Sequence, residues 1–446
     1  MLPTGLALVA SAVLGGVVVA AGAVAAFAAS RWQPGSFDAP VLAAETWDAR
    51  SGSWSPAGTL DDRRVDPVLV SLGAGRVLLA GGRWQDIGIT GDLVWSASTH
   101  AYDAIGGPQI ALQCRRAIAL PGDRVLFTSS SNADTWGIGL WHAALYDLGA
   151  KKWSTIETPD REGVRAAAAL DATRVLFVFR SSAAVWRSDT DAWAPGPPTI
   201  TGEESRDCPS ALAVALPDGR VLVLDERFQA ADARSWAWIW EPAGGTLVTA
   251  RALQDAFAAL PRAPPGAEVA MDTVALGPAG EIVLAGRDAA YVVPPTLDAV
   301  AAFTYPKARP DAAIAVLADG RVLRAGGTVD GAAVRDAEVI DPRARRVETT
   351  GSLLEARAGA GAVALPGGAV LVAGGSRAVR SFHERGFAEL LVPTLVALVA
   401  LAGFMAIVRR SRRRALVVAT AFVGAVLVAV AGTLLLLYAI GSAIKG

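Results

Sequence analysis

The stretch Gly-Arg-Val-Leu-Arg-Ala-Gly-Gly (residues 320–327) decides the fold, because six other segments of the chain repeat its pattern. In each copy a run of small residues leads into a tight turn and then into a short apolar run. That apolar run often ends in a Gly-Gly pair. The other copies are GRVLLAGG (75–82), DRVLFTSS (123–130), TRVLFVFR (173–180), GRVLVLDE (219–226), GEIVLAGR (280–287) and GAVLVAGG (368–375). Their spacing of 40 to 61 residues predicts an array of similar supersecondary units.

Each copy extends into a unit of four short strands, as the copy at residues 320–327 illustrates. The small apolar residues before it suit an innermost strand beside a crowded axis. Asp319-Gly320 supplies the first hairpin turn, because Asp and Gly tolerate positive φ. The Gly-Gly pair ends the second strand where the backbone must bend without a Cβ. The strands expected in this unit are residues 312–317, 322–325, 337–340 and one that begins at Val347.

The turn between the third and fourth strands carries an aromatic signature. It occurs as Trp47-Asp48 followed by Trp54, as Tyr146-Asp147 followed by Trp153, and as Trp186 followed by Trp193. Together with the Gly-Gly pairs, this pattern resembles the kelch-repeat family, which includes the central domain of galactose-oxidase-like proteins. The resemblance covers roughly residues 41–380. It implies a β-propeller whose blades are four-stranded antiparallel sheets.

The two ends of the repeat array complement each other. An aromatic turn at residues 44–54 precedes the first strand pair, and the last pair, at residues 361–375, has no such turn after it. The two segments together make one blade. The N-terminal strands are therefore expected to close the ring and protect its edges. We predict an all-β, seven-bladed kelch-like propeller over residues 31–387.

Three uncharged apolar stretches flank the repeats: residues 3–29, 390–408 and 415–444. Each is of the length that crosses a bilayer as a helix, which takes about 20 residues. Five arginines lie in the loop at 409–414, and such loops stay in the cytoplasm. We therefore expect a multi-pass protein of the cytoplasmic membrane with one N-terminal segment (1–30) and a C-terminal helical hairpin (388–446). The propeller would face the periplasm or exterior, and the lipid bilayer is one expected partner.

The first apolar segment has two interpretations. Ala26-Phe27-Ala28 fits a signal-peptidase site, so residues 1–30 could be a cleaved signal peptide. The apolar run of about 25 residues is longer than the usual 7 to 15 of a signal peptide, and no basic residue precedes it. These features favour a retained anchor. The great excess of Arg over Lys favours a bacterial source of high GC content.

An arginine recurs just before the expected innermost strands. Arg64, Arg309 and Arg357 occupy the same place in three units, and Arg116 and Arg165 fall nearby in two others. In kelch domains that bind peptides, similarly placed arginines line the pocket. The resemblance thus implies that these five ring one mouth of the axis and bind ligand. Repeated residues usually serve the repeat itself, so the alternative is that they join blades through backbone carbonyls or carboxylates.

Residues with catalytic or metal-binding patterns are sparse. His100, His142 and His383 have no ligand spacing, and no metal, cofactor or catalytic residue is expected. Cys114 and Cys208 are expected one blade apart and free, although a disulfide stays open. Trp236, Trp238 and Trp240 alternate along one strand face. They suit packing between blades, or stacking on a sugar ring if exposed.

Charge excludes one class of partner. The chain has 41 basic and 42 acidic residues; residues 388–446 hold six and one of these, which leaves 35 against 41 in the propeller, or −6. This argues against nucleic acid, which needs a basic surface. We expect a protein- or glycan-binding or scaffold module. The alternative is a carbohydrate-active enzyme at the cell surface with its site at the propeller mouth, which requires a suitably spaced carboxylate pair.

Overall fold

The computed structural model describes residues 40–84, 87–88, 91–107, 115–129, 143–159, 163–179, 182–198, 211–225, 237–260, 271–286 and 288–377. All belong to one compact unit, Asp38–Val379. The membrane segments expected at 1–30 and 388–446 lie outside the described residues, as do both cysteines. Within the described ranges, no helix has the length and apolar character needed to cross a membrane.

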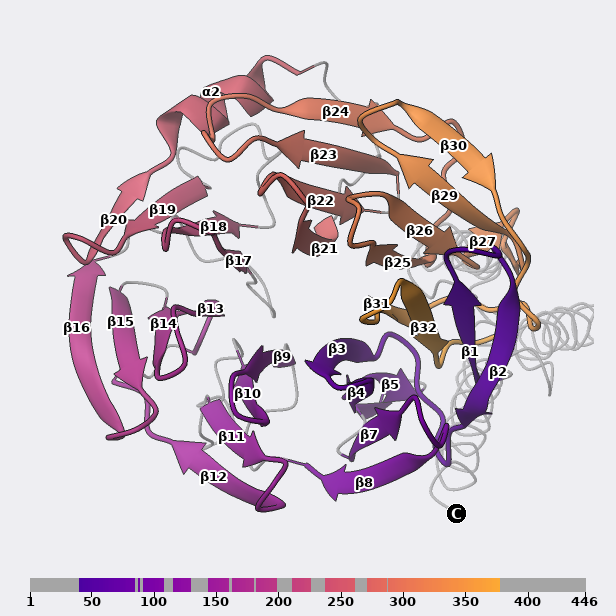
Figure 1. Cartoon of the computed structure of the whole chain (residues 1–446), viewed down its shortest axis with the longest axis horizontal. Coiled ribbons are helices and arrows are strands. Elements are labelled where there is room, and N and C mark those ends of the chain that lie inside the picture. The colour runs from indigo at the N-terminus through magenta and orange to yellow at the C-terminus, as the bar shows by residue number, and fades with distance from the viewer. Residues whose placement is uncertain are drawn as a thin grey trace, which may run out of the picture. The chain divides into compact units, whose positions relative to one another are not determined.

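The described residues form seven four-stranded antiparallel sheets arranged around one axis (Figure 1). The protein is a seven-bladed β-propeller. From the axis outward, blade 1 contains β3 (Val68–Gly73), β4 (Arg76–Ala80), β7 (Asp92–Ser96) and β8 (Tyr102–Gly106). Blade 2 contains β9 (Arg115–Leu120), β10 (Arg124–Ser129), β11 (Ala143–Asp147) and β12 (Lys152–Ile156). Blade 3 contains β13 (Ala166–Ala169), β14 (Arg174–Val178), β15 (Ser182–Arg187) and β16 (Ala192–Pro198).

The remaining blades follow the same order. Blade 4 contains β17 (Ala211–Ala215), β18 (Val221–Asp225), β19 (Ala237–Glu241) and β20 (Thr246–Thr249). Blade 5 contains β21 (Met271–Leu276), β22 (Ile282–Gly286), β23 (Ala289–Val293) and β24 (Ala301–Thr304). Blade 6 contains β25 (Ala313–Val316), β26 (Val322–Ala325), β29 (Ala337–Asp341) and β30 (Arg346–Thr349). Short hairpins extend blade 1, with β5 (Arg83–Trp84) and β6 (Ile87–Gly88), and blade 6, with β27 (Thr328–Val329) and β28 (Ala332–Ala333).

Blade 7 closes the ring with strands from both ends of the propeller. It contains β31 (Gly361–Ala364), β32 (Ala369–Ala373), β1 (Ala43–Asp48) and β2 (Trp54–Thr59). The N-terminal β1 pairs antiparallel with the C-terminal β32, with Glu45 opposite Val372 and Asp48 opposite Ala369. The innermost strands of all seven blades contact their neighbours in turn, from β31 to β3 and round to β25. The predicted closure by the N-terminal strands is confirmed.

Apolar side chains fill each space between neighbouring blades. The described residues form seven buried clusters, one per blade interface, such as the one that joins Leu222 of blade 4 to Leu284 of blade 5. Tryptophans reinforce these interfaces: the indole N–H of Trp153 donates to the Ile105 carbonyl of the preceding blade at 2.8 Å. Trp238 and Trp240 are buried between blades 3 and 4, as packing requires, and Trp236 lies outside the described residues.

The Gly-Gly pairs bend the chain toward the next blade. Gly327 of blade 6 has a φ of 88° and donates its N–H to the Arg357 carbonyl of blade 7 at 2.9 Å. Gly375 of blade 7, with a φ of 93°, donates in the same way to the Arg64 carbonyl of blade 1 at 2.9 Å. The motif thus joins adjacent blades, which explains why glycine is repeated there.

One element is missing from the sequence prediction. The helix α2 (Arg251–Ala258) follows β20 and covers the outer edge of blade 4 (Figure 1). It buries Leu253 and Phe257 in the cluster between blades 4 and 5. The longest repeat spacing, 61 residues between Arg220 and Glu281, contains this insertion. Surface insertions of this kind leave the blade core intact.

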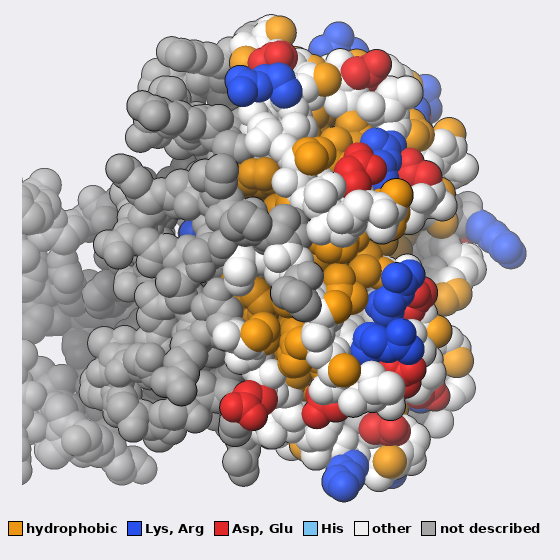
Figure 2. All heavy atoms as spheres, turned by 90° about the vertical axis from the view of Figure 1, so that its left-hand side faces the viewer, with side chains coloured by type: hydrophobic (Ala, Val, Ile, Leu, Met, Phe, Trp, Pro, Cys, Tyr) orange, Lys and Arg blue, Asp and Glu red, His pale blue; other side chains and the backbone are white. Residues whose placement is uncertain are grey.

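The disc has two faces, which we name by their connections. The turn face carries the hairpins that join strands one to two and three to four of each blade. The arginines that follow these hairpins bridge blades: Arg76 pairs with Asp123 at 2.5 Å, and Arg220 donates to the Pro295 carbonyl at 3.1 Å. At the edge of the disc near β16 and β20, basic and acidic side chains lie beside one another, with apolar side chains between them (Figure 2). The opposite face, the loop face, carries the loops that enter each innermost strand.

Candidate binding pocket on the loop face of blade 6

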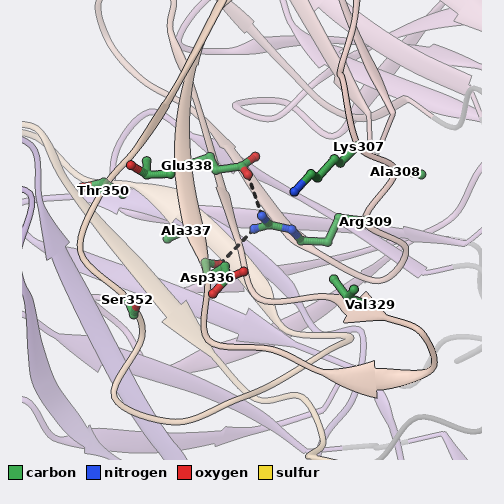
Figure 3. Close-up of a pocket in the computed structure, with 10 residues that line it drawn as sticks. Lys307, Ala308, Arg309, Val329, Asp336, Ala337, Glu338, Thr350 and Ser352 are labelled. Atoms are coloured by element: carbon green, nitrogen blue, oxygen red, sulfur yellow. Dashed lines mark hydrogen bonds and ion pairs between the residues drawn. The ribbon is translucent and has the colours of Figure 1, made fainter.

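A pocket of about 520 Å³ lies on the loop face of blade 6 (Figure 3). The loop before β25 supplies one side, the β27–β28 hairpin another, and the ends of β29 and β30 the floor. The lining residues are Lys307, Ala308, Arg309, Val329, Asp336, Ala337, Glu338, Thr349, Thr350 and Ser352. Most of them are polar, so the pocket suits a ligand that makes hydrogen bonds.

Strand geometry explains why polar groups gather here. Side chains alternate between the two faces of a strand, so Asp336 and Glu338 share one face while Ala337 between them is buried. Glu338 lies directly opposite Thr349 in the register of β29 with β30. The strand pair therefore presents a carboxylate and a hydroxyl-bearing residue side by side.

Two arginines from different elements donate hydrogen bonds to the Glu338 carboxylate. Arg309 donates to one oxygen at 2.7 Å and to the Asp336 carbonyl at 3.0 Å. Arg324 of β26 donates to the other oxygen at 2.7 Å and to the Lys307 carbonyl at 2.9 Å. Arg324 also lies over the Tyr305 ring, 4.7 Å from its centroid. These contacts hold the loop that carries Lys307 and Arg309 against the blade.

The ion pair between Arg309 and Glu338 is largely buried, and burial affects the charge state of its arginine. The side chains of Arg309 and Glu338 are 5% and 12% exposed. Burial lowers the pKa of Arg309; the negative charge of Glu338 opposes this, and the positive charge of Arg324 adds to it. The guanidinium groups are thus held in a partly desolvated setting where charge interactions act more strongly than in water.

The pocket offers a ligand one positively and one negatively charged side chain. Lys307 and Asp336 are exposed, and among the described residues neither side chain has an ion-pair partner. In Figure 3 the Lys307 ammonium points into the pocket. Ser352 adds a hydroxyl at the opposite end, whereas the Thr350 hydroxyl accepts from the Trp47 indole at 3.0 Å and donates to Gly52. Within the described residues no group of His, Cys, Asp and Glu side chains could hold a metal ion.

The arginines selected from the sequence are bound to protein groups. Arg357 is fully buried; it pairs with Glu45 and donates to the Ala43 carbonyl at 2.7 Å. Arg64 is 1% exposed and donates to Asp62 at 2.6 Å and to the Gly81 and Gly91 carbonyls, each at 3.2 Å. Arg309 is the one member of the set that lines the pocket.

The other two arginines selected from the sequence, Arg116 and Arg165, lie at or just before innermost strands. Arg116 is half-buried in β9, opposite Thr128. Arg165 is 5% exposed just before β13, and its carbonyl accepts from the Ala211 N–H of the next blade at 3.2 Å. Ligand binding by the five arginines therefore stays a prediction. The side chains of Arg64, Arg309 and Arg357 contact carbonyls and carboxylates of their own blades, so these contacts are not the links between adjacent blades that the alternative expects. Of the histidines, only His100 is described, exposed at a hairpin turn with a φ of 55°.

No protein-family model matches the chain, and no curated protein matches its sequence. Among solved structures it is similar to the extracellular domain of a one component system from B. thetaiotaomicron, with 9% identity over 71% of this chain and a TM-score of 0.45. A second structure, of a hybrid two component system from the same organism, gives 8% identity over 66% and a TM-score of 0.43. The chain spans 38% and 34% of the lengths of these two.

A fungal alcohol oxidase of the AA5 family, solved in complex with copper, gives 16% identity over 72% of both chains and a TM-score of 0.47. Identities this low carry no argument about activity. They leave the function to be argued from the residues of this chain.

The sequence prediction missed Lys307, Asp336 and Glu338. Lys307 and Asp336 lie outside the repeated motif, and the strand position of Glu338 carries a glutamate again only in blade 7, at Glu45, so no regular period marks them. One signal was present: Arg324 places a charge inside the apolar run of its copy, where the other copies carry Val, Leu or Phe. A charge in a strand that is otherwise buried indicates a partner on the facing strand.

Proposed function

We propose that the chain is a kelch-like propeller, tethered to the membrane, that binds an exposed polar segment of a partner protein in the blade 6 pocket. The observation that carries this proposal is that an exposed ammonium, Lys307, and an exposed carboxylate, Asp336, both line a pocket in which Arg309 and Glu338 already pair with each other. A peptide offers hydrogen-bonding groups and charges of both signs that complement such a lining.

Two other ligand classes fit the pocket less well. Sugar rings commonly stack on aromatic side chains, and the lining residues include none. A carbohydrate-active enzyme needs two carboxylates free to act on the bond. Both oxygens of Glu338 accept guanidinium donors, which leaves Asp336 as the available carboxylate of this pocket. A peptide-binding role therefore has the better support.

Removing the two exposed charges of the pocket is expected to reduce partner capture about tenfold, because an exposed ion pair contributes up to about 1 kcal/mol and a tenfold change corresponds to about 1.4 kcal/mol. The variant is Lys307→Ala with Asp336→Ala in the full-length membrane protein, and capture is measured by proximity labelling and pull-down. The matched control, Lys152→Ala with Asp103→Ala, removes one exposed charge of each sign from blades 2 and 1 and should capture normally. Equal capture by both variants would exclude the pocket as the binding site.

The membrane arrangement is a separate part of the proposal. In a background with Cys114→Ser and Cys208→Ser, we expect Ala332→Cys, on the β27–β28 hairpin, to react with a membrane-impermeant thiol reagent that reaches the outer surface of the cytoplasmic membrane in intact cells. Ser411→Cys, within the Arg-rich loop, should react only after permeabilisation. The reverse pattern of labelling would show that the propeller faces the cytoplasm.

A further inference from the structure

The polar pocket of blade 6 has one large aliphatic residue in its lining. Val329 of β27 is 44% exposed, and it is one of three large apolar side chains that are exposed among the described residues. It belongs to none of the seven buried clusters at the blade interfaces. Single exposed apolar residues are common on protein surfaces, so exposure alone identifies no site. What distinguishes Val329 is its place at the hairpin side of the pocket (Figure 3).

The hairpin that carries Val329 is joined to the charged loop of the pocket. Its turn, Asp330-Gly331, has φ values of 51° and 78°, the positive values with which a two-residue turn matches the twist of its strands. At the base of the hairpin the Thr328 N–H donates to the Pro310 carbonyl at 2.8 Å. Pro310 directly follows Arg309, which lines the pocket. Main-chain hydrogen bonds therefore set the position of Val329 relative to the charged groups.

An apolar cross-strand pair occupies the tip of this hairpin. Val329 lies opposite Ala332, and directly opposite residues place their side chains on the same face. Blade 1 carries the other hairpin of this kind in the described part of the chain, and the same register position there pairs Trp84 with Ile87. Both hairpins form two-stranded sheets separate from the four-stranded blades. The apolar pair is therefore not needed to assemble a blade, and its recurrence favours a role in contacting a partner.

We propose that the blade 6 pocket selects a peptide with an aliphatic or aromatic side chain next to its charged residues, and that Val329 binds this side chain. The charged residues of the peptide would meet Lys307 and Asp336, while the apolar side chain would cover Val329 and the methyl group of Ala332. Covering exposed apolar surface on binding is favourable, and the polar contacts fix the orientation of the peptide. This inference rests on the proposed peptide-binding function and names the kind of segment that the site recognises.

The variant Val329→Thr tests this residue while the hairpin keeps its fold. Threonine has the same branched shape and also favours strands, but it replaces one methyl group by a hydroxyl. Val248→Thr is the matched control, because Val248 is also 44% exposed and lies in β20 of blade 4, away from the residues that line the pocket. A melting temperature within a few degrees of wild type confirms that each variant is folded.

The probe is a phage-displayed library of random heptapeptides, selected on the full chain in detergent after removal of phage that bind the detergent alone. We expect the bound peptides to carry an aliphatic or aromatic residue beside a charged one more often than the unselected library does. One bound peptide is then synthesised, together with a copy in which serine replaces the apolar residue. By fluorescence anisotropy the wild type should bind the original about fivefold more tightly, since burying one methylene group corresponds to a ratio of about four. This preference should fall to about twofold or less in Val329→Thr and stay unchanged in Val248→Thr.

The outcomes separate the two proposals. Bound peptides without an apolar residue beside the charged one, or equal binding of the synthetic peptide and its serine copy, would overturn the apolar preference and leave peptide binding in place. A full preference in a folded Val329→Thr would overturn the role of Val329. Binding that is unchanged in the Lys307→Ala, Asp336→Ala variant, or the absence of any bound peptide, would overturn peptide binding in the pocket and this inference with it.

Discussion

Replacing Arg357 by alanine is expected to lower the free energy of unfolding by about 3–5 kcal/mol, the usual cost of removing one partner of a buried ion pair. Arg357 and Glu45 are 0% and 1% exposed, so the change leaves a buried carboxylate without its counter-charge. The Arg357 guanidinium also donates to the Ala43 carbonyl of β1. The pair joins the N-terminal strand to the C-terminal part of the ring, and its loss weakens the blade that closes the propeller.

Urea unfolding of the full chain, followed by tryptophan fluorescence, measures this effect. Arg346→Ala is the matched control, because the Arg346–Glu348 pair lies in an outermost strand. The side chain of Arg346 is 68% exposed and that of Glu348 is 46% exposed. Exposed pairs contribute about 0–1 kcal/mol. Adding Glu45→Gln to Arg357→Ala should restore part of the loss, since the neutral amide oxygen still accepts the Leu354 N–H. Equal losses in Arg357→Ala and Arg346→Ala would show that the buried pair does not secure the ring.

Gly374→Ala is the second change for which we expect a large effect, a loss of about 3 kcal/mol in the free energy of unfolding. Gly374 has a φ of 75°, which side chains with a Cβ rarely adopt, and a Cβ there would lie 2.6 Å from the Arg64 carbonyl oxygen. That oxygen already accepts the Gly375 N–H across the blade 7–blade 1 interface. The added methyl group therefore strains the backbone and pushes neighbouring blades apart.

Gly367→Ala separates these two causes. Gly367 also has a positive φ, 96°, but a Cβ at this position would meet no atom within 4 Å. It should lose about 1–2 kcal/mol, from backbone strain alone. The same urea unfolding measures both variants. If Gly374→Ala lost no more than Gly367→Ala, the close approach of the two blades would contribute nothing to stability.

Local sequence patterns predicted the blade strands well, because each strand is specified by its own turn and its own apolar run. In blade 6 the second strand occupies the predicted residues, 322–325, and the third begins at Ala337 as predicted. The helix α2 was missed, because its eight residues lie between two copies of the repeat and no sequence motif indicates a helix there. The long spacing signalled an insertion without revealing its structure.

The site was predicted less well, because its residues come from parts of the blade that the repeat does not govern. Arg309 was selected as a recurrent arginine, and it does line the pocket. Lys307 and Asp336 lie in connecting segments, and Glu338 lies in the third strand at a position whose residue varies from blade to blade. Their proximity depends on the pairing of β26 with β29 and on the path of the loop before β25. Neither can be read from spacing alone.

The amino-acid sequence by itself determined the number of blades, the four-stranded form of each and the closure of the ring by the N-terminal strands. Turn residues, alternating apolar positions and the complementary ends of the array are local signals, and each acts over a few residues. Only the tertiary structure decided what the repeated arginines do and where a pocket forms. Those outcomes depend on which carbonyls and carboxylates meet a buried guanidinium, and these groups come from strands that are distant in sequence and meet only when the sheets assemble.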